Sequence, residues 1–136
     1  MEINHFIGSG IPYNIDRCDS IVGRIFVDHE VECGSLNIIQ IGDTELLEIN
    51  KKHLEHDYYT DIITFRTDEG ETIESGELYI SYERAKENNP QDVQSEIHRL
   101  IFHGCLHLCG WEDGTSEEKE KMREQENKYL LFHVEQ

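Results

Sequence analysis

The fold of this chain is decided by the stretch DVQSEIHRLIFHGCLHLCGWED, which spans residues 92–113. Its apolar side chains recur at the spacing of one buried helical stripe, at Val93, Ile97, Leu100, Ile101 and Leu108. Gly110 follows the last of them, and glycine is the usual residue where a helix ends and the chain turns. We therefore expect a helix over residues 92–109, after which the chain turns back.

Two histidines on this predicted helix indicate a metal site. His103 and His107 are four residues apart, so their side chains lie about 40° apart around a helix and project from one face. Asp113 stands six positions after His107, beyond the turn, from where a carboxylate can approach the same ion. We predict that His103, His107 and Asp113 bind one metal ion, with Glu112 as the alternative third ligand.

The spacing is similar to that of zinc proteases with an extended His-x-x-x-His-x-x-Gly-x-x-ligand signature. Those enzymes carry a glutamate directly after the first histidine as the general base, whereas this chain has Gly104. A metalloprotease-like hydrolase is therefore the less favoured alternative. Cys105 and Cys109 project away from the histidine pair on a helix, and we expect them to be buried free thiols.

Arg99 lies on the histidine face of the same helix, one turn before His103 and close to Glu96. Its guanidinium has two alternative partners. It contacts a phosphate and stabilises charge during a reaction, or it forms an ion pair with Glu96. We predict His103 and Arg99 as the catalytic residues and keep the ion pair as the ordinary alternative.

The remaining sequence predicts an α+β fold, a single domain over residues 1–136 with a mixed sheet of about four strands. Alternating or β-branched segments predict strands at 1–7, 36–41, 58–65 and 76–81. Helices are expected at 19–29, from an Asp43 cap onward, before Asn89 and at 116–132, the last opened by a capping box from Thr115 to Glu118. Helices would pack on the sheet, with the metal-binding helix lining a cleft.

Composition limits the classes of function. The 136 residues carry 29 acidic side chains against 12 lysines and arginines, for a net charge of −17. That charge argues against anionic membranes and long phosphate-binding grooves, although a bound metal can reverse the local field. Apolar runs are far shorter than the roughly 20 residues of a membrane span. With no signal-peptide pattern at the start, we expect a cytoplasmic protein with reduced cysteines.

Three segments together resemble a known family. They are His103-Gly104-x-Leu106-His107-Leu108-x-Gly110-Trp111, Thr60-Asp61-Ile62-Ile63-Thr64-Phe65 and Gly76-Glu77-Leu78-Tyr79-Ile80-Ser81. The first is similar to the hallmark segment of the bacterial YbeY endoribonucleases, and the other two are similar to the Thr-Asp-Val-Leu-Ser-Phe and Gly-Asp-Ile-x-Ile-Ser blocks of that family. The resemblance covers residues from about 36 to 130 in the family's order.

This resemblance implies a single-strand-specific, metal-dependent endoribonuclease that matures the 3′ end of small-subunit ribosomal RNA and acts in ribosome quality control. The implied partners are single-stranded ribosomal RNA and the ribosome or its small subunit. Family members hold one zinc ion on three histidines, two of which match His103 and His107, whereas Asp113 stands at the third. The family also has an arginine shortly before the Thr-Asp strand, where this chain has Leu54.

Two functions remain open from the sequence. Three protein ligands leave a fourth position on the ion for water or a phosphate oxygen, which favours a hydrolase, because structural zinc sites are closed by four protein ligands. The net charge and Leu54 favour a non-catalytic ribosome-assembly factor in which the metal only staples the Asp113 loop to the helix. Metal content and RNA cleavage distinguish the two.

Overall fold

The structure is a computed structural model that describes residues 1–132. Four strands and five helices occur in that part of the chain. In chain order they are β1 (Glu2–Phe6), α1 (Ile15–Asp28), β2 (Cys33–Ile41), α2 (Asp43–Leu54), β3 (Ile62–Arg66), β4 (Ile73–Ser81), α3 (Tyr82–Asn88), α4 (Val93–Leu108) and α5 (Ser116–Leu130).

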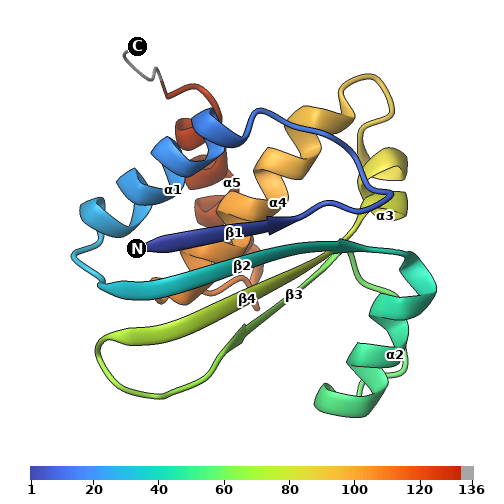
Figure 1. Cartoon of the computed structure of the whole chain (residues 1–136), viewed down its shortest axis with the longest axis horizontal. Helices are drawn as coiled ribbons and strands as arrows, with labels where there is room; N and C mark the ends of the chain where they lie inside the picture. The colour runs from blue at the N-terminus through green and yellow to red at the C-terminus, as the bar shows by residue number, and fades with distance from the viewer. Residues whose placement is uncertain (133–136) are drawn as a thin grey trace.

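The strands form one mixed sheet in the order β1-β2-β4-β3. β1, β2 and β4 are parallel, and β3 runs antiparallel to β4 at the edge. Figure 1 shows the chain passing from β1 to β2 through α1, and from β2 to β4 through α2 and the edge strand β3. The predicted α+β class with a four-stranded mixed sheet is confirmed.

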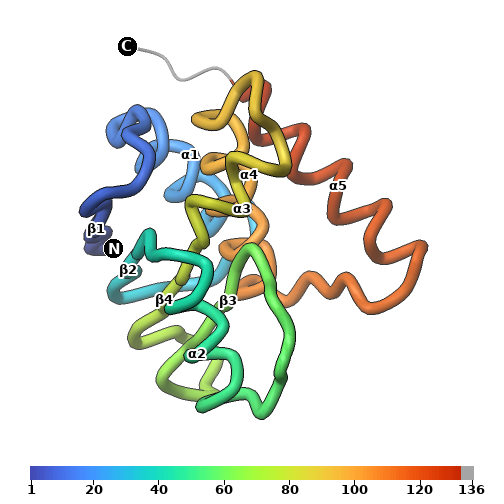
Figure 2. The backbone as a smooth tube through the Cα atoms, turned by 90° about the vertical axis from the view of Figure 1, so that its right-hand side faces the viewer, coloured from blue at the N-terminus to red at the C-terminus, as the bar shows by residue number. Residues whose placement is uncertain are grey.

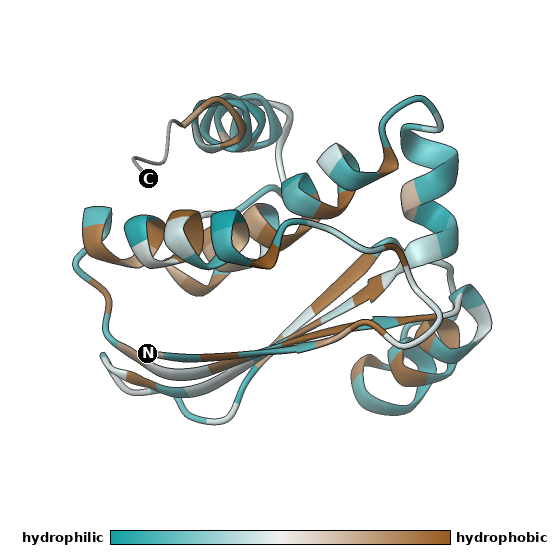
Figure 3. Cartoon of the chain, turned by 45° about the horizontal axis from the view of Figure 1, so that its top comes forward, coloured by the Kyte–Doolittle hydropathy of each residue, from teal (hydrophilic) through white to brown (hydrophobic). Residues whose placement is uncertain are grey.

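Helices α1, α4 and α5 lie in two layers over one face of the sheet, whereas α2 lies outside these layers and contacts β3 and β4. Figure 3 shows α1 and α4 against that face, and Figure 2 shows α5 on the outside of α4. The buried core lies between the sheet and the inner helices, and its fully buried members include Ile21, Ile25, Leu36, Ile38, Leu78, Ile80, Ile97 and Ile101. Helix α4 is therefore enclosed by the sheet on one side and by α5 on the other.

Gly104 sets how closely α4 approaches the sheet. A Cβ atom built at this position would lie 2.6 Å from Cδ2 of Leu78 and 3.1 Å from Cδ1 of Ile62. Leu78 is fully buried on β4, so a larger side chain at position 104 would have to displace core atoms. The glutamate of the zinc-protease signature does not fit here, which agrees with the preference against a protease.

Several boundaries differ from the sequence predictions for local reasons. α1 begins at Ile15 rather than near 19, because the Asn14 side chain accepts a hydrogen bond from Arg17 N (3.0 Å) and caps the helix. Asp43 is the first residue of α2 and does not cap it; Gly42 occupies the cap position. The expected capping box from Thr115 to Glu118 is present at the start of α5.

The strand predictions were right in number but wrong at their ends. β3 begins at Ile62 rather than at Tyr58, because residues 55–61 form a connection held to α2. β2 and β4 each start three residues earlier than expected, at Cys33 and Ile73, where they pair with each other. β3 ends at Arg66, one residue beyond the predicted strand over 58–65.

Candidate metal centre

The two predicted histidine ligands stand one turn apart on α4. Their rings are nearly perpendicular, with centroids 4.5 Å apart, and their Nε2 atoms approach to 3.0 Å. The opposite side of the helix is buried in the core through residues such as Ile97, Ile101 and Cys105. Burial of that stripe fixes the rotation of α4, so both imidazoles emerge on the side that lines a cleft.

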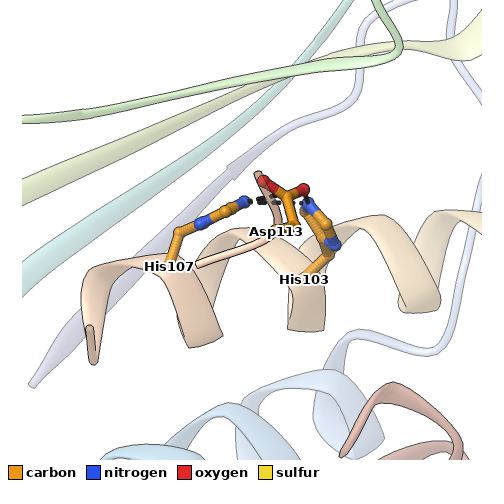
Figure 4. A group of neighbouring side chains, drawn as sticks. All are labelled: His103, His107 and Asp113. Carbon is orange, nitrogen blue, oxygen red and sulfur yellow. Dashed lines mark hydrogen bonds and ion pairs between the residues drawn. The ribbon is translucent and has the colours of Figure 1, made fainter. Parts of the chain in front are cut away.

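The turn after α4 brings the third predicted ligand to this pair. Gly110 has a φ of +102°, a conformation that glycine adopts without strain, and Trp111 N donates to Leu106 O (3.0 Å). Asp113 then lies with Oδ2 3.3 Å from His103 Nε2 and 3.4 Å from His107 Nε2. Figure 4 shows the three side chains pointing at one another above α4.

Hydrogen bonds on the far side of each imidazole fix where its proton is. His107 Nδ1 lies 2.9 Å from the carbonyl oxygen of Trp111, which can only accept, so Nδ1 carries the proton. His103 Nδ1 lies 2.7 Å from Glu126 Oε2, and an ionised carboxylate also only accepts. In the neutral form of each ring, the Nε2 lone pair then faces the Asp113 oxygen, and a cation between these three atoms relieves their repulsion.

The spacing of the three atoms fits a tetrahedral ion. Zinc–nitrogen and zinc–oxygen bonds of about 2.0–2.2 Å at tetrahedral angles place neighbouring ligand atoms about 3.3–3.5 Å apart. The three observed separations are 3.0, 3.3 and 3.4 Å, so the atoms outline one face of such a tetrahedron. Among the described residues, these three form a group that could hold a metal ion, and the fourth corner stays open.

Glu126 on α5 is a part of the site that the sequence analysis missed. Its side chain is almost fully buried, and its two oxygens accept from different donors, His103 Nδ1 (2.7 Å) and Arg99 Nη1 (2.8 Å). Burial alone would raise the pKa of Glu126, but the hydrogen bonds from His103 and Arg99 outweigh it, and the pKa lies below its usual value. Glu126 is thus a carboxylate that orients His103.

The contacts of Arg99 match the ion-pair alternative and extend it. Its guanidinium pairs with Glu96 on its own helix, where Nε lies 2.8 Å from Oε1, and with Glu126 on α5. The side chain is only 13% exposed and does not line the cleft. In this arrangement Arg99 lies behind His103 and is joined to it through Glu126, rather than next to the three ligand atoms.

A cleft of about 940 Å³ opens in front of the three ligand residues. Its other walls come from β3 and from residues 50–61, and they include Leu54, so the position where the family arginine would stand presents a leucine to the cleft. The lysine and arginine side chains on the walls are Arg66 and Lys119. Arg66 donates to Gly70 O (2.5 Å), whereas Lys119 is exposed and has no ion pair within residues 1–132.

The remaining predicted residues lie outside the ligand group. Glu112, the alternative third ligand, lines a separate hollow with Cys109 and Trp111. All four cysteines are free, and Cys105 is fully buried as predicted, but Cys109 is only partly buried because it lies at the exposed end of α4. Trp111 packs against the core and donates from Nε1 to His29 Nε2 (2.7 Å).

Comparisons with known proteins agree with the family resemblance of the sequence. The family model described as Endoribonuclease YbeY matches residues 16–133. The Endoribonuclease YbeY of Bacteroides fragilis is 46% identical over 114 residues, covering 82% of this chain and 81% of the relative. That of Parabacteroides distasonis is 45% identical over 102 residues, with 73% and 71% covered.

A similar fold occurs in a solved structure. The solution structure of a Thermotoga maritima protein superposes with a TM-score of 0.59 at 22% identity, covering 94% of this chain and 86% of the other. At that identity the likeness supports the fold alone. Within residues 1–132, no helix is long and apolar enough to cross a membrane.

Proposed function

The chain belongs to the YbeY endoribonuclease family, and on that premise we propose that it is a metal-dependent endoribonuclease specific for single-stranded RNA. The proposed substrate is the 3′ end of small-subunit ribosomal RNA, cleaved during maturation and ribosome quality control in the cytoplasm. The proposed partner is the small ribosomal subunit, and residues 1–136 act as one catalytic domain.

The observation that carries this proposal is the convergence of His103, His107 and Asp113 on the wall of an open cleft. We propose that they bind one zinc ion, because two imidazole nitrogens and one carboxylate oxygen at this spacing suit its tetrahedral preference. When bound, the ion supplies a Lewis acid that polarises a phosphoryl oxygen or lowers the pKa of a bound water to about 7. The three residues that would hold the ion line the cleft through which a strand would enter.

The protein residues have separate tasks around that centre. His103, His107 and Asp113 hold the ion, and Glu126 keeps the Nε2 lone pair of His103 directed at it. For Arg99 we propose a positioning role, in which its hydrogen bond to Glu126 holds that carboxylate in place. Lys119 is an exposed cation on the cleft wall, without an ion pair among residues 1–132, and is suited to contact an RNA phosphate.

One experiment tests the proposal directly. Purified wild-type protein is analysed for bound zinc and assayed on a single-stranded ribosomal RNA fragment and on the same fragment annealed to its complement. We expect about one zinc per chain and cleavage of the single strand alone. His107→Ala should lose both metal and cleavage, whereas His53→Ala, which alters a histidine on α2 outside the cleft lining, should retain both.

The alternative function is a non-catalytic assembly factor whose metal only fastens the Asp113 loop to α4. The observation that favours it is the presence of Leu54 on the cleft wall, where a cation would assist phosphate chemistry. In the same experiment this alternative predicts bound zinc and RNA binding without any cleavage of the single strand.

A further inference from the structure

The cleft has a second functional element in the connection between α2 and β3. We infer that His56 and Tyr58 form an aromatic platform on which an unpaired RNA base stacks while the strand lies across the metal centre. The inference rests on the proposed function and adds to it a means of recognising single strands. Both residues line the same cleft as His103, His107 and Asp113.

The geometry of the two rings is that of an offset stack. Their centroids are 5.1 Å apart, their planes differ by 19°, and a hydrogen bond of 3.0 Å joins Tyr58 Oη to His56 Nδ1. The imidazole thus supports the phenol ring. Tyr58 is nevertheless 57% exposed, so more than half of this residue remains accessible where it lines the cleft.

A buried asparagine holds the platform in place through the backbone. Asn50 on α2 is 1% exposed; its Nδ2 donates to Tyr58 O (2.9 Å), and its own carbonyl oxygen accepts from His56 N (3.1 Å). Glu55 follows the last residue of α2 and precedes His56. Its φ of +57° turns the chain there, a strained conformation for a residue with a Cβ. The connection is therefore a built structure that presents these two rings.

The chemistry of the cleft favours a nucleic-acid base as the occupant of this platform. Base stacking on aromatic side chains contributes to single-strand binding without sequence preference, because every base has a flat π face. A base inside a duplex is already stacked on its neighbours and cannot reach the platform. With a net charge of −17, the protein gains little affinity from long-range attraction to phosphates, so stacking carries a larger share of strand binding.

The test is cleavage kinetics of the zinc-loaded full chain on a single-stranded oligoribonucleotide, compared with a series in which one nucleotide at a time is abasic. One abasic position should raise KM for the wild type by about 5- to 150-fold, the effect of one lost base stack, with a smaller change in kcat. Tyr58→Ala should raise KM for the intact strand similarly, and the abasic position should then have no further effect. Tyr58→Phe should behave like the wild type.

Tyr59→Ala is the matched control. Tyr59 is the neighbouring tyrosine and is 49% exposed, but it does not line the cleft, and its ring faces the Arg84 guanidinium at 4.9 Å. The fold of Tyr58→Ala should survive, because Asn50 holds only the backbone of residue 58. A thermal melt checks this.

Each outcome decides a different claim. Unchanged KM in Tyr58→Ala, with normal cleavage by the wild type, overturns the platform and leaves the proposed function intact. A raised KM with the abasic effect undiminished in the variant also overturns it, since Tyr58 would then contact something other than that base. Absence of cleavage by the wild type overturns the proposed function and the platform with it.

Discussion

Glu126→Gln tests whether a buried carboxylate on α5 controls metal binding by residues on α4. The substitution keeps the shape of the side chain and removes its charge. The two carboxylate oxygens now accept from His103 Nδ1 and Arg99 Nη1, at 2.7 and 2.8 Å. Glutamine has one oxygen and one NH₂ group, so in either orientation one of those two donors faces another donor.

The structure gives the expected magnitude. The charged groups behind the site are Glu96 and Glu126 with Arg99 and the exposed Arg123. Together with Asp113 they carry three negative charges against two positive ones, and the net charge of −1 favours a bound cation. Removing the charge of Glu126 weakens that balance and frees the His103 ring to rotate. Loss of such a supporting hydrogen bond typically lowers metal affinity by about 10- to 100-fold. The unpaired donor should also lower the free energy of unfolding by about 1–3 kcal/mol.

The assay is competition for zinc between the protein and a chromophoric chelator, with urea unfolding of the metal-free protein in parallel. Glu124→Gln is the matched control, because it makes the same charge change on the same helix at an exposed residue. We expect the control to bind zinc like the wild type. Equal zinc affinity in Glu126→Gln and Glu124→Gln would refute the argument that Glu126 orients His103.

Three further predictions concern other groups. Asp113→Ala should bind less than one zinc per chain, whereas Glu112→Ala should bind one. Asp113→His should keep its zinc and reach half-maximal cleavage at a lower pH, because a neutral ligand leaves the ion more Lewis-acidic. Burial raises the pKa of Cys109 to about 12 and also raises that of Cys18, Cys33 and Cys105, so a thiol reagent at pH 8 should label the native protein slowly and the urea-unfolded chain fast. Because the unfolded thiols ionise near pH 9 while the folded ones stay protonated, urea midpoints should fall from pH 9 upward. Burial and the nearby Arg17 lower the pKa of His98, so below about pH 6.5 the unfolded chain takes up a proton that the folded chain does not. The urea midpoint of the wild type should therefore fall between pH 7 and pH 5, and that of His98→Phe should fall by less.

Sequence reasoning succeeded where the interactions are local along the chain. The periodicity from Val93 to Leu108 predicted α4, and the four-residue spacing of His103 and His107 predicted that they share a face. The turn at Gly110 needs only a positive φ and the hydrogen bond from Trp111 N to Leu106 O. The predicted ligand residues are brought together because all of them lie in one stretch of eleven residues, 103–113, around the end of α4.

Tertiary structure alone decided what surrounds those residues. His103 meets Glu126 across 23 positions of sequence. Helical spacing places Glu126 on the buried face of α5 with Met122 and Tyr129, but it does not identify His103 as its partner. Asn50 donates a hydrogen bond to the Tyr58 carbonyl oxygen. The strand predicted over 58–65 therefore begins only at Ile62, and the residues before it form a wall of the cleft. The physical reason is that helix periodicity and turns depend on neighbouring residues, whereas partners between elements depend on how whole helices and strands pack, which local patterns do not specify.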